Sequence, residues 1–243
     1  MSPSIDQLTR HVQGRVIVPS DDAYDETRRT FNAMLDRRPA VIVQPTRTAD
    51  VVSAVRWAAE ANLPISIRGG GHSVAGHSVG DGSLMIDLVN LRTVVVDRKA
   101  RVAEVGGGAK LEHLDDATTK HDLVAPSGTY SDTGVGGLVL GGGLSYVLAS
   151  RGLACDALVG AELVTADGTV VEVDEEREPE LLWALRGGGG NFGVVTKLRM
   201  ALTPLRDVYL GRMYFRGSGA AGSEEHTSDS TIIVRGQKVP SFY

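Results

Sequence analysis

The sequence predicts a globular α+β fold, and three observations support this prediction. Hydrophobic residues make up 42% of the 243 residues, which is enough to bury a core. A strand, a helix and a second strand follow one another between Val41 and Ile67, and two hairpins come later in the chain. At roughly 100 to 200 residues per domain, the length corresponds to one large domain or two small ones.

The segment 41–67 predicts a parallel strand–helix–strand unit. The apolar run 41–43 forms the first strand, and Ile65 to Ile67 forms the second. Between them Thr48 is expected to cap a helix that ends at Asn62. The second strand runs directly into the loop Arg68 to Ser73, and ligands in α/β structures collect at the carboxyl ends of strands. The sequence therefore predicts a binding loop at this position.

The remaining elements follow from local patterns of apolar and turn residues. Hairpins are expected across Asp97 to Ala100 and, more strongly, across Asp167-Gly168. Further strands are predicted at 84–88 and 192–202, and helices at 111–120, 144–150 and 180–185. Residues 217–231 hold no apolar side chain larger than alanine, which predicts a flexible tail with at most an isolated strand at 232–234.

The 30 glycines fall mostly in runs, which indicates turns that another group approaches closely. Gly69, Gly70 and Gly71 let successive backbone N–H groups converge on an anion, and Ser73 can add a hydroxyl donor. The alternative is a solvated turn with a passive histidine. Because glycine-rich turns recur at 133–137 and 141–143, one bound pyrophosphate explains all three more simply than three unrelated turns.

Two other glycine patterns do not predict nucleotide binding. Gly188-x-Gly190-x-x-Gly193 matches the dinucleotide fingerprint in letters, but a helix precedes it and a strand follows, which reverses the required order. The run 106–108 is expected to be a strand-ending turn. No Gly-Lys-Ser/Thr follows any glycine run, which excludes a Walker-type phosphate loop.

The composition argues against several kinds of partner and site. The net charge is −5 and no basic stripe is present, so nucleic acid is not expected as a partner. The single cysteine, Cys155, excludes an intrachain disulfide and a cysteine-based metal cluster, and is expected to be a buried core residue. No metal site is indicated. With no signal-like start and no apolar run of about 18 residues, a soluble cytoplasmic protein without membrane contact is expected.

Several ordered motifs together resemble the FAD-binding domain of the vanillyl-alcohol-oxidase / p-cresol-methylhydroxylase superfamily, and within it the berberine-bridge-enzyme-like FAD-linked oxidases. The similarity runs from about Arg38 to Pro204. It is carried by Pro45-Thr46, Arg68-Gly-Gly-Gly-His72-Ser73, Gly134-Val-Gly-Gly137 with Gly141-Gly-Gly143, Leu182-Trp183-Ala-Leu-Arg-Gly-Gly-Gly and Phe192-Gly193-Val-Val-Thr196.

The resemblance implies a domain of the p-cresol-methylhydroxylase type at 38–206, made of two α+β subdomains at about 38–100 and 101–206 that hold FAD between them. An N-terminal segment would occupy 1–37. Residues 207–216 resemble the start of a substrate domain, and 217–243 would be a flexible or aberrant tail. The chain is therefore expected to be C-terminally truncated relative to this family.

The resemblance also implies which residues bind FAD. His72 matches the histidine that bonds to the flavin 8α-methyl group. Gly69, Gly70, Gly71 and Ser73 would bind the pyrophosphate, with His77 and Ser78 continuing the cradle; Asp132, Thr133, Gly137 and Gly141 would line flavin and phosphate, and Val195 would meet the adenine. Members with two covalent bonds carry a cysteine where Tyr130 stands here, so a single covalent bond through His72 is expected.

The implied activity is that of an oxidoreductase which transfers hydride from an alcohol, sugar or amine to flavin and then to dioxygen. No catalytic base can be named. Two alternatives stay open, a truncated flavin-binding remnant without turnover and a non-redox nucleotide-binding module.

Five further residues are expected to have no functional role. His113 and His121 should be surface histidines, Asp115 should be solvated together with Asp116, and Trp183 should lie in the core.

Overall fold

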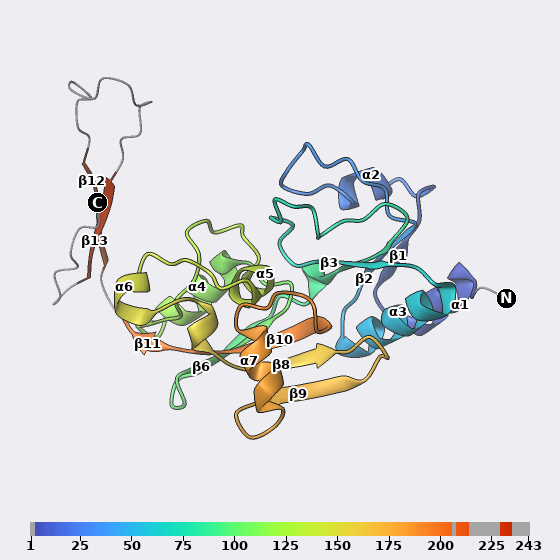
Figure 1. Ribbon diagram of the computed structural model, residues 1–243. Coiled ribbons are helices and arrows are strands. Elements are labelled where there is room, and N and C mark those ends of the chain that lie inside the picture. The colour runs from blue at the N-terminus through green and yellow to red at the C-terminus, as the bar shows by residue number, and fades with distance from the viewer. Residues whose placement is uncertain (1–2, 206–207, 214–228, 235–243) are drawn as a thin grey trace.

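The computed structural model describes residues 3–205, 208–213 and 229–234, and two sheets organise it (Figure 1). The first sheet has the strand order β1 (Arg15–Ile17), β2 (Val41–Gln44), β4 (Leu84–Asp87) and β3 (Ile65–Arg68). The second has the order β5 (Val94–Asp97), β6 (Val102–Gly106), β10 (Val194–Ala201), β8 (Leu158–Val164) and β9 (Val170–Asp174). The two subdomains of the predicted α+β fold correspond to these sheets.

The strand–helix–strand unit is present, with one strand inserted into it. β2 and β3 are parallel as predicted, but β4 lies between them and pairs with both. The inserted strand is buried at all four positions, because it is covered on both faces. Helix α3 (Thr48–Ala61) ends at Asn62 in the left-handed region (φ 54°), as expected. Its N-cap is Arg47, so the predicted cap Thr48 is wrong by one residue.

The N-terminal segment is part of the first subdomain instead of standing apart from it. β1 pairs with β2, and helix α1 (Ile5–His11) packs on α3. The buried carboxylate of Asp50 accepts hydrogen bonds from the backbone of Gln13 (3.0 Å) and Gly14 (3.1 Å), which ties this segment to α3. Burial alone would raise the pKa of Asp50, but these hydrogen bonds and those from Thr46 hold it below its usual value.

The second sheet is antiparallel, and both predicted hairpins are confirmed. Since β5 pairs with β6, the predicted subdomain boundary near residue 100 falls inside a hairpin, and the second sheet begins at Val94. Helices α4 (Leu111–Thr119), α5 (Val135–Leu140) and α7 (Pro179–Leu185) supply side chains to the core on one face of this sheet. The helix predicted at 144–150 is reduced to the single turn α6 (Leu148–Arg151).

The last three strands of the described part belong to two small sheets of two strands each. β7 (Leu123–Val124) pairs with β11 (Thr203–Pro204), and β12 (Val208–Met213) pairs with β13 (Asp229–Val234). The strand expected at 232–234 is therefore longer and is paired, although it falls within the predicted tail. The rest of that tail, 217–228 and 235–243, lies outside the described residues.

Three predictions of side-chain environment are wrong. Trp183 is 75% exposed because α7 turns Leu182 and Leu185 inward on its opposite face. His113 is half-buried, and its Nδ1 accepts the Lys110 N–H at 2.9 Å, which caps α4. Asp115 is also half-buried, so burial and the neighbouring Asp116 raise its pKa.

A fourth prediction of side-chain environment is also wrong, and a fifth is confirmed. His121 is half-buried where a surface position was predicted. Cys155 is buried, as expected, and burial raises the pKa of its thiol. Among the described helices, none is long and apolar enough to cross a membrane.

Candidate functional site

The glycine loop after β3 lies against two backbone segments of the second subdomain. A Cβ atom on Gly70 would stand 2.2 Å from the backbone nitrogen of Gly134, and one on Gly69 would stand 3.2 Å from the carbonyl oxygen of Gly107. Gly71 has φ +76°, which side chains rarely allow. The loop therefore needs glycine because the two subdomains meet there backbone to backbone.

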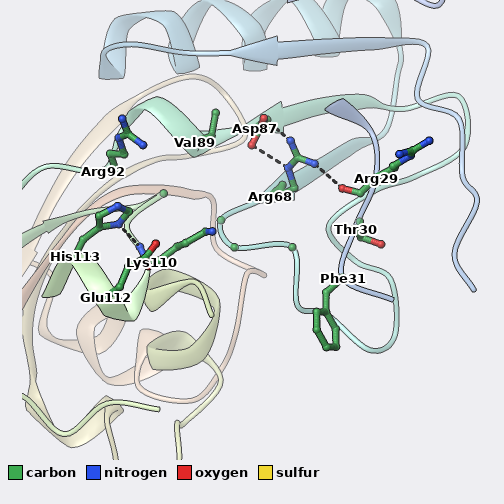
Figure 2. Close-up of a pocket in the computed structure, with 14 residues that line it drawn as sticks. Arg29, Thr30, Phe31, Arg68, Asp87, Val89, Arg92, Lys110, Glu112 and His113 are labelled. Atoms are coloured by element: carbon green, nitrogen blue, oxygen red, sulfur yellow. Dashed lines mark hydrogen bonds and ion pairs between the residues drawn. The ribbon is translucent and has the colours of Figure 1, made fainter. Parts of the chain in front are cut away.

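A buried ion pair fixes the start of this loop. Arg68, the last residue of β3, and Asp87, the last residue of β4, are register partners. Their side chains form two hydrogen bonds of 2.9 and 2.5 Å, and the Asp87 side chain is fully buried. Arg68 also donates to the carbonyl oxygens of Thr27 (2.5 Å) and Arg29 (2.8 Å). One guanidinium thus joins both strands to the N-terminal segment (Figure 2).

A cavity of about 230 Å³ lies beside the glycine loop (Figure 2). Its lining combines backbone, cationic, acidic and apolar groups from both subdomains: Gly69, Gly70, Gly71, Gly108, Arg29, Arg68, Arg92, Lys110, His113, Asp87, Glu112, Thr30, Phe31 and Val89. Figure 2 shows Lys110 reaching toward the loop. Lysine and arginine side chains next to a glycine turn suit an anionic group such as a phosphate.

His72 is held from both sides at the end of the loop. Its Nε2 lies 3.2 Å from Oδ2 of Asp132, and its ring stacks on Phe31 with centroids 4.4 Å apart and planes 18° apart. The His72 side chain is 21% exposed, so it is restrained yet reachable. Phe31 had no signal in the sequence, because it is a lone aromatic residue in a polar stretch of the N-terminal segment.

The other loop residues differ in what they contact. The Ser73 hydroxyl accepts the His77 N–H at 3.1 Å and so closes a turn, while His77 itself is exposed. The Ser78 hydroxyl is buried and has no hydrogen-bond partner among the described residues. A buried hydroxyl without a partner leaves a donor for a bound polar group or a water molecule to satisfy, although Ser78 is not among the residues that line the cavity.

Of the residues predicted from the second subdomain, Asp132 contacts His72 at the end of the loop, and the others have different surroundings. Thr133 follows Asp132 and accepts the Leu111 N–H at 2.9 Å, which places it at the start of α4. Gly137 in α5 and Gly141 at its end are exposed, and a Cβ atom on Gly137 would meet nothing within 4 Å. The Val195 side chain packs in the hydrophobic core of the second subdomain, so an adenine contact would have to use its backbone.

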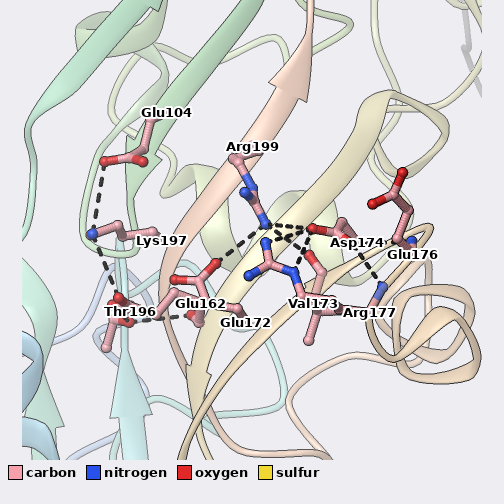
Figure 3. A network of polar contacts seen from close by, with 10 residues as sticks. All are labelled: Glu104, Glu162, Glu172, Val173, Asp174, Glu176, Arg177, Thr196, Lys197 and Arg199. Atoms are coloured by element: carbon pink, nitrogen blue, oxygen red, sulfur yellow. Dashed lines mark hydrogen bonds and ion pairs between the residues drawn. The ribbon is translucent and has the colours of Figure 1, made fainter.

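A polar network on the second sheet reaches the first subdomain through Thr48. Figure 3 shows the members of this network that belong to the second subdomain. Glu162 on β8 accepts hydrogen bonds of 2.6 Å from Thr48 at the start of α3 and from Thr196 on β10. Lys197 lies 3.5 Å from the same carboxylate. Burial alone would raise the pKa of Glu162, but these three partners hold it below its usual value. The network therefore stabilises the junction that positions the glycine loop.

The remaining glycine patterns have structural roles. The run 106–108 sits between β6 and α4 with its backbone packed against carbonyl oxygens of Leu91, Val195 and Leu88. The segment 188–193 follows α7 and precedes β10, which confirms that it lacks the strand-then-helix order of a dinucleotide fingerprint.

Comparison with known protein families decides the identity of the domain. Residues 39–174 match the family described as FAD binding domain, which is more than half of the chain. The chain belongs to this family. The predicted p-cresol-methylhydroxylase type of FAD-binding domain, with its FAD-linked oxidase relatives, is confirmed.

This FAD-binding domain is similar in sequence to known enzymes and similar in fold to solved structures. (R)-6-hydroxynicotine oxidase from Paenarthrobacter nicotinovorans is 37% identical over 80% of this chain and 42% of the relative. The structure of 6-hydroxy-D-nicotine oxidase from Arthrobacter nicotinovorans superimposes with a TM-score of 0.82 at 35% identity, over 84% of this chain and 45% of that one.

A third relative is described with a doubly attached cofactor. Glucooligosaccharide oxidase from Acremonium strictum superimposes with a TM-score of 0.81 at 32% identity, over 88% of this chain and 46% of that one. It is described as carrying 6-S-cysteinyl, 8α-N1-histidyl FAD. The chain thus spans less than half the length of each of these relatives.

Proposed function

We propose that this domain binds FAD and carries it as a single covalent 8α-histidyl adduct on His72. The observation that carries the proposal is the placement of His72, which is stacked on Phe31 and contacts Asp132 at the end of the glycine loop. A neutral imidazole nitrogen is a sufficient nucleophile for such a bond. The fit of the loop to a diphosphate is supported by the unpartnered Ser78 hydroxyl and by the close approach of Gly70 to Gly134.

Within the proposed function, the residues of this chain bind and orient. Backbone N–H groups of Gly69, Gly70 and Gly71, with the Ser78 hydroxyl, would hold the pyrophosphate. The Arg68–Asp87 pair keeps that loop in place. The bound FAD supplies hydride acceptance from a substrate and reoxidation by dioxygen. The names of the relatives point to cyclic amines and oligosaccharides as substrate classes, with alcohols as the third candidate.

Attachment through one residue follows from the absence of a second nucleophile at the expected position. Tyr130 stands where bicovalent family members carry cysteine, and it is 74% exposed. The single cysteine, Cys155, is buried further along the chain, beside α6 and before β8. The cysteinyl bond described for glucooligosaccharide oxidase therefore has no counterpart in this proposal.

His72→Ala is expected to abolish acid-stable flavin. The wild-type chain should be yellow after purification with FAD, and its absorbance near the flavin maximum should stay with the acid precipitate. In His72→Ala the colour should move to the supernatant, because the nucleophile is gone while the glycine loop is unchanged. A wild-type chain that takes up no FAD at all would support the non-redox nucleotide-binding alternative. Oxygen uptake with an amine, sugar and alcohol panel separates an oxidase from a flavin-binding remnant.

Ser78→Ala is expected to weaken FAD binding without destabilising the free protein. Its hydroxyl has no partner to lose, so the melting temperature of the flavin-free chain should hold or rise. One hydrogen bond to a charged phosphate contributes about 1.5 kcal/mol, so affinity should fall roughly tenfold.

A matched control for Ser78→Ala is Ser66→Ala, another buried serine. The Ser66 hydroxyl is hydrogen-bonded to that of Ser83 at 2.9 Å, so its removal should lower the melting temperature and leave FAD affinity unchanged. A loss of stability in Ser78→Ala with unaltered affinity would assign Ser78 to the fold instead of to the cofactor.

A further inference from the structure

We propose that the cavity beside the glycine loop is a second binding site, separate from the FAD site, which holds a phosphate oxyanion with Lys110 as its main side-chain donor. The cavity has a volume of about 230 Å³. Sites for larger organic ligands typically measure roughly 300–1,000 Å³. A cavity of this size therefore suits a small ion, or the phosphate group of a small molecule, better than it suits a whole dinucleotide.

The residues that line the cavity differ from those that the proposed function assigns to FAD. The two sets share only Gly69, Gly70 and Gly71. His72, which would carry the flavin, is absent from the lining, as are Ser78 and every residue that the second subdomain would contribute to FAD. The glycine loop is therefore a wall between two places, and the cavity lies on the side that the cofactor does not need.

Three cationic side chains of the lining have no anionic partner. Arg29, Arg92 and Lys110 form no ion pair and no side-chain hydrogen bond with any of the described residues. Lys110 is half-buried, whereas the two arginines are exposed. Figure 2 shows Arg92 and Lys110 on one side of the glycine loop and Arg29 on the other. An anion between them would neutralise charges that no described group of the protein neutralises.

The charge balance of the cavity matches a phosphate group. Arg68 is neutralised by Asp87 in the buried ion pair, so this pair adds no net charge. Glu112 is the other carboxylate of the lining, and it is exposed. The three unpaired cations and Glu112 leave a net charge of +2, in a chain whose net charge is −5. A phosphomonoester carries about −1.5 to −2 charges at pH 7 and has three acceptor oxygens.

His113 supplies a further donor. Its Nδ1 accepts the Lys110 N–H at 2.9 Å, so a neutral ring has its proton on Nε2. This Nε2–H has no acceptor among the described residues, and His113 lines the cavity. A phosphate oxygen can accept from this N–H and from the Lys110 ammonium group at once.

The site depends on side chains, because the backbone at the start of α4 is already used. The N–H groups of Leu111 and Glu112 donate to carbonyl oxygens in the segment 131–133, both at 2.9 Å. The Lys110 N–H is taken by His113. Removal of one side-chain charge should therefore be enough to impair the site. Since Arg29 belongs to the first subdomain and Lys110 to the second, a bound oxyanion would also stabilise the junction between them.

The test measures phosphate binding to the full chain purified without flavin, by calorimetric titration and by the rise in melting temperature. Ionic strength is held constant with chloride, because salt screens exposed charges. Inorganic phosphate and glycerol 3-phosphate are titrated separately, and the tighter binder shows whether a free ion or a phosphorylated small molecule is the source of the phosphate group.

Lys110→Met keeps the aliphatic stem and removes the charge. It should weaken phosphate binding at least about tenfold, which corresponds to the loss of one charge-assisted hydrogen bond. Arg92→Gln should weaken binding about two- to fivefold, as is typical of an exposed charge pair, and it keeps the test decisive if Lys110→Met lowers stability. Lys120→Met is the matched control, since it removes an exposed lysine at the other end of α4, and it should bind phosphate as the wild type does.

A titration of FAD with and without saturating phosphate tests whether the two sites are separate. FAD affinity should stay within about twofold or rise. A fall in FAD affinity in proportion to the phosphate concentration would overturn the inference, because the cavity would then be part of the cofactor site. So would a wild-type chain that responds to phosphate no more than to chloride, and so would wild-type phosphate binding by both Lys110→Met and Arg92→Gln. The phosphate titration needs no flavin, so its outcome is distinct from that of the proposed function.

Discussion

Gly70→Ala is expected to destabilise the protein and abolish FAD binding. The new Cβ would stand 2.2 Å from the nitrogen and 2.6 Å from the Cα of Gly134, and the opposing group is backbone, which cannot rotate away. Overpacking of this kind costs about 1–3 kcal/mol even where side chains can adjust. We expect a loss at the upper end of that range, measured by urea unfolding, together with no detectable FAD in a fluorescence titration.

Gly190→Ala is the matched control. Gly190 lies in the loop between α7 and β10, has no positive φ, and a Cβ atom there would meet nothing within 4 Å. Its unfolding free energy should stay within about 0.5 kcal/mol of wild type, as for surface substitutions generally. If Gly70→Ala unfolded at the wild-type urea concentration and bound FAD normally, the two subdomains would not meet at Gly134 as the structure has them.

Gly70 and Gly190 both lie in glycine-rich loops, but they differ in tertiary contacts that a local sequence pattern does not predict. The sequence predicts the glycine loop, its place after β3 and the two hairpins, because turn chemistry and strand periodicity are properties of neighbouring residues. The contact of Gly70 with Gly134 depends on tertiary packing. So do the insertion of β4 between β2 and β3 and the membership of β5 in the second sheet.

In the candidate site, too, the sequence predicts individual residues but not the contacts between them. His72 and Asp132 could each be named from motifs, but the 3.2 Å contact between them joins different subdomains and is not encoded by spacing. Phe31 is exposed and isolated in sequence, so only the fold reveals that it stacks on His72. The prediction that Trp183 lies in the core was wrong because it used the size of the side chain alone. On this helix of seven residues, Leu182 and Leu185 form the buried face, and Trp183 points away from it.

Arg68→Met is expected to cost about 3–5 kcal/mol of unfolding free energy, the typical result of removing one partner from a buried ion pair. The Asp87 carboxylate is fully buried, and after the substitution its remaining side-chain donor is Gln44 at 2.7 Å. The carbonyl oxygens of Thr27 and Arg29 lose their donor as well. Because these contacts hold the N-terminal segment beside the glycine loop, FAD affinity should fall along with stability.

A double-mutant cycle separates the ion pair from the rest of this effect. Asp87→Asn removes the buried charge, keeps an acceptor for Gln44 and leaves Arg68 with its two carbonyl partners, so it should cost less than Arg68→Met. In the double variant Arg68→Met/Asp87→Asn no charge is left buried without a partner, and stability should exceed that of Arg68→Met alone. Additive losses would show that the two side chains are not coupled. Recovered stability without recovered FAD affinity would instead assign the binding defect to the freed segment at Thr27 to Arg29, because its carbonyl oxygens accept hydrogen bonds from Arg68 and would lose them in the double variant as well.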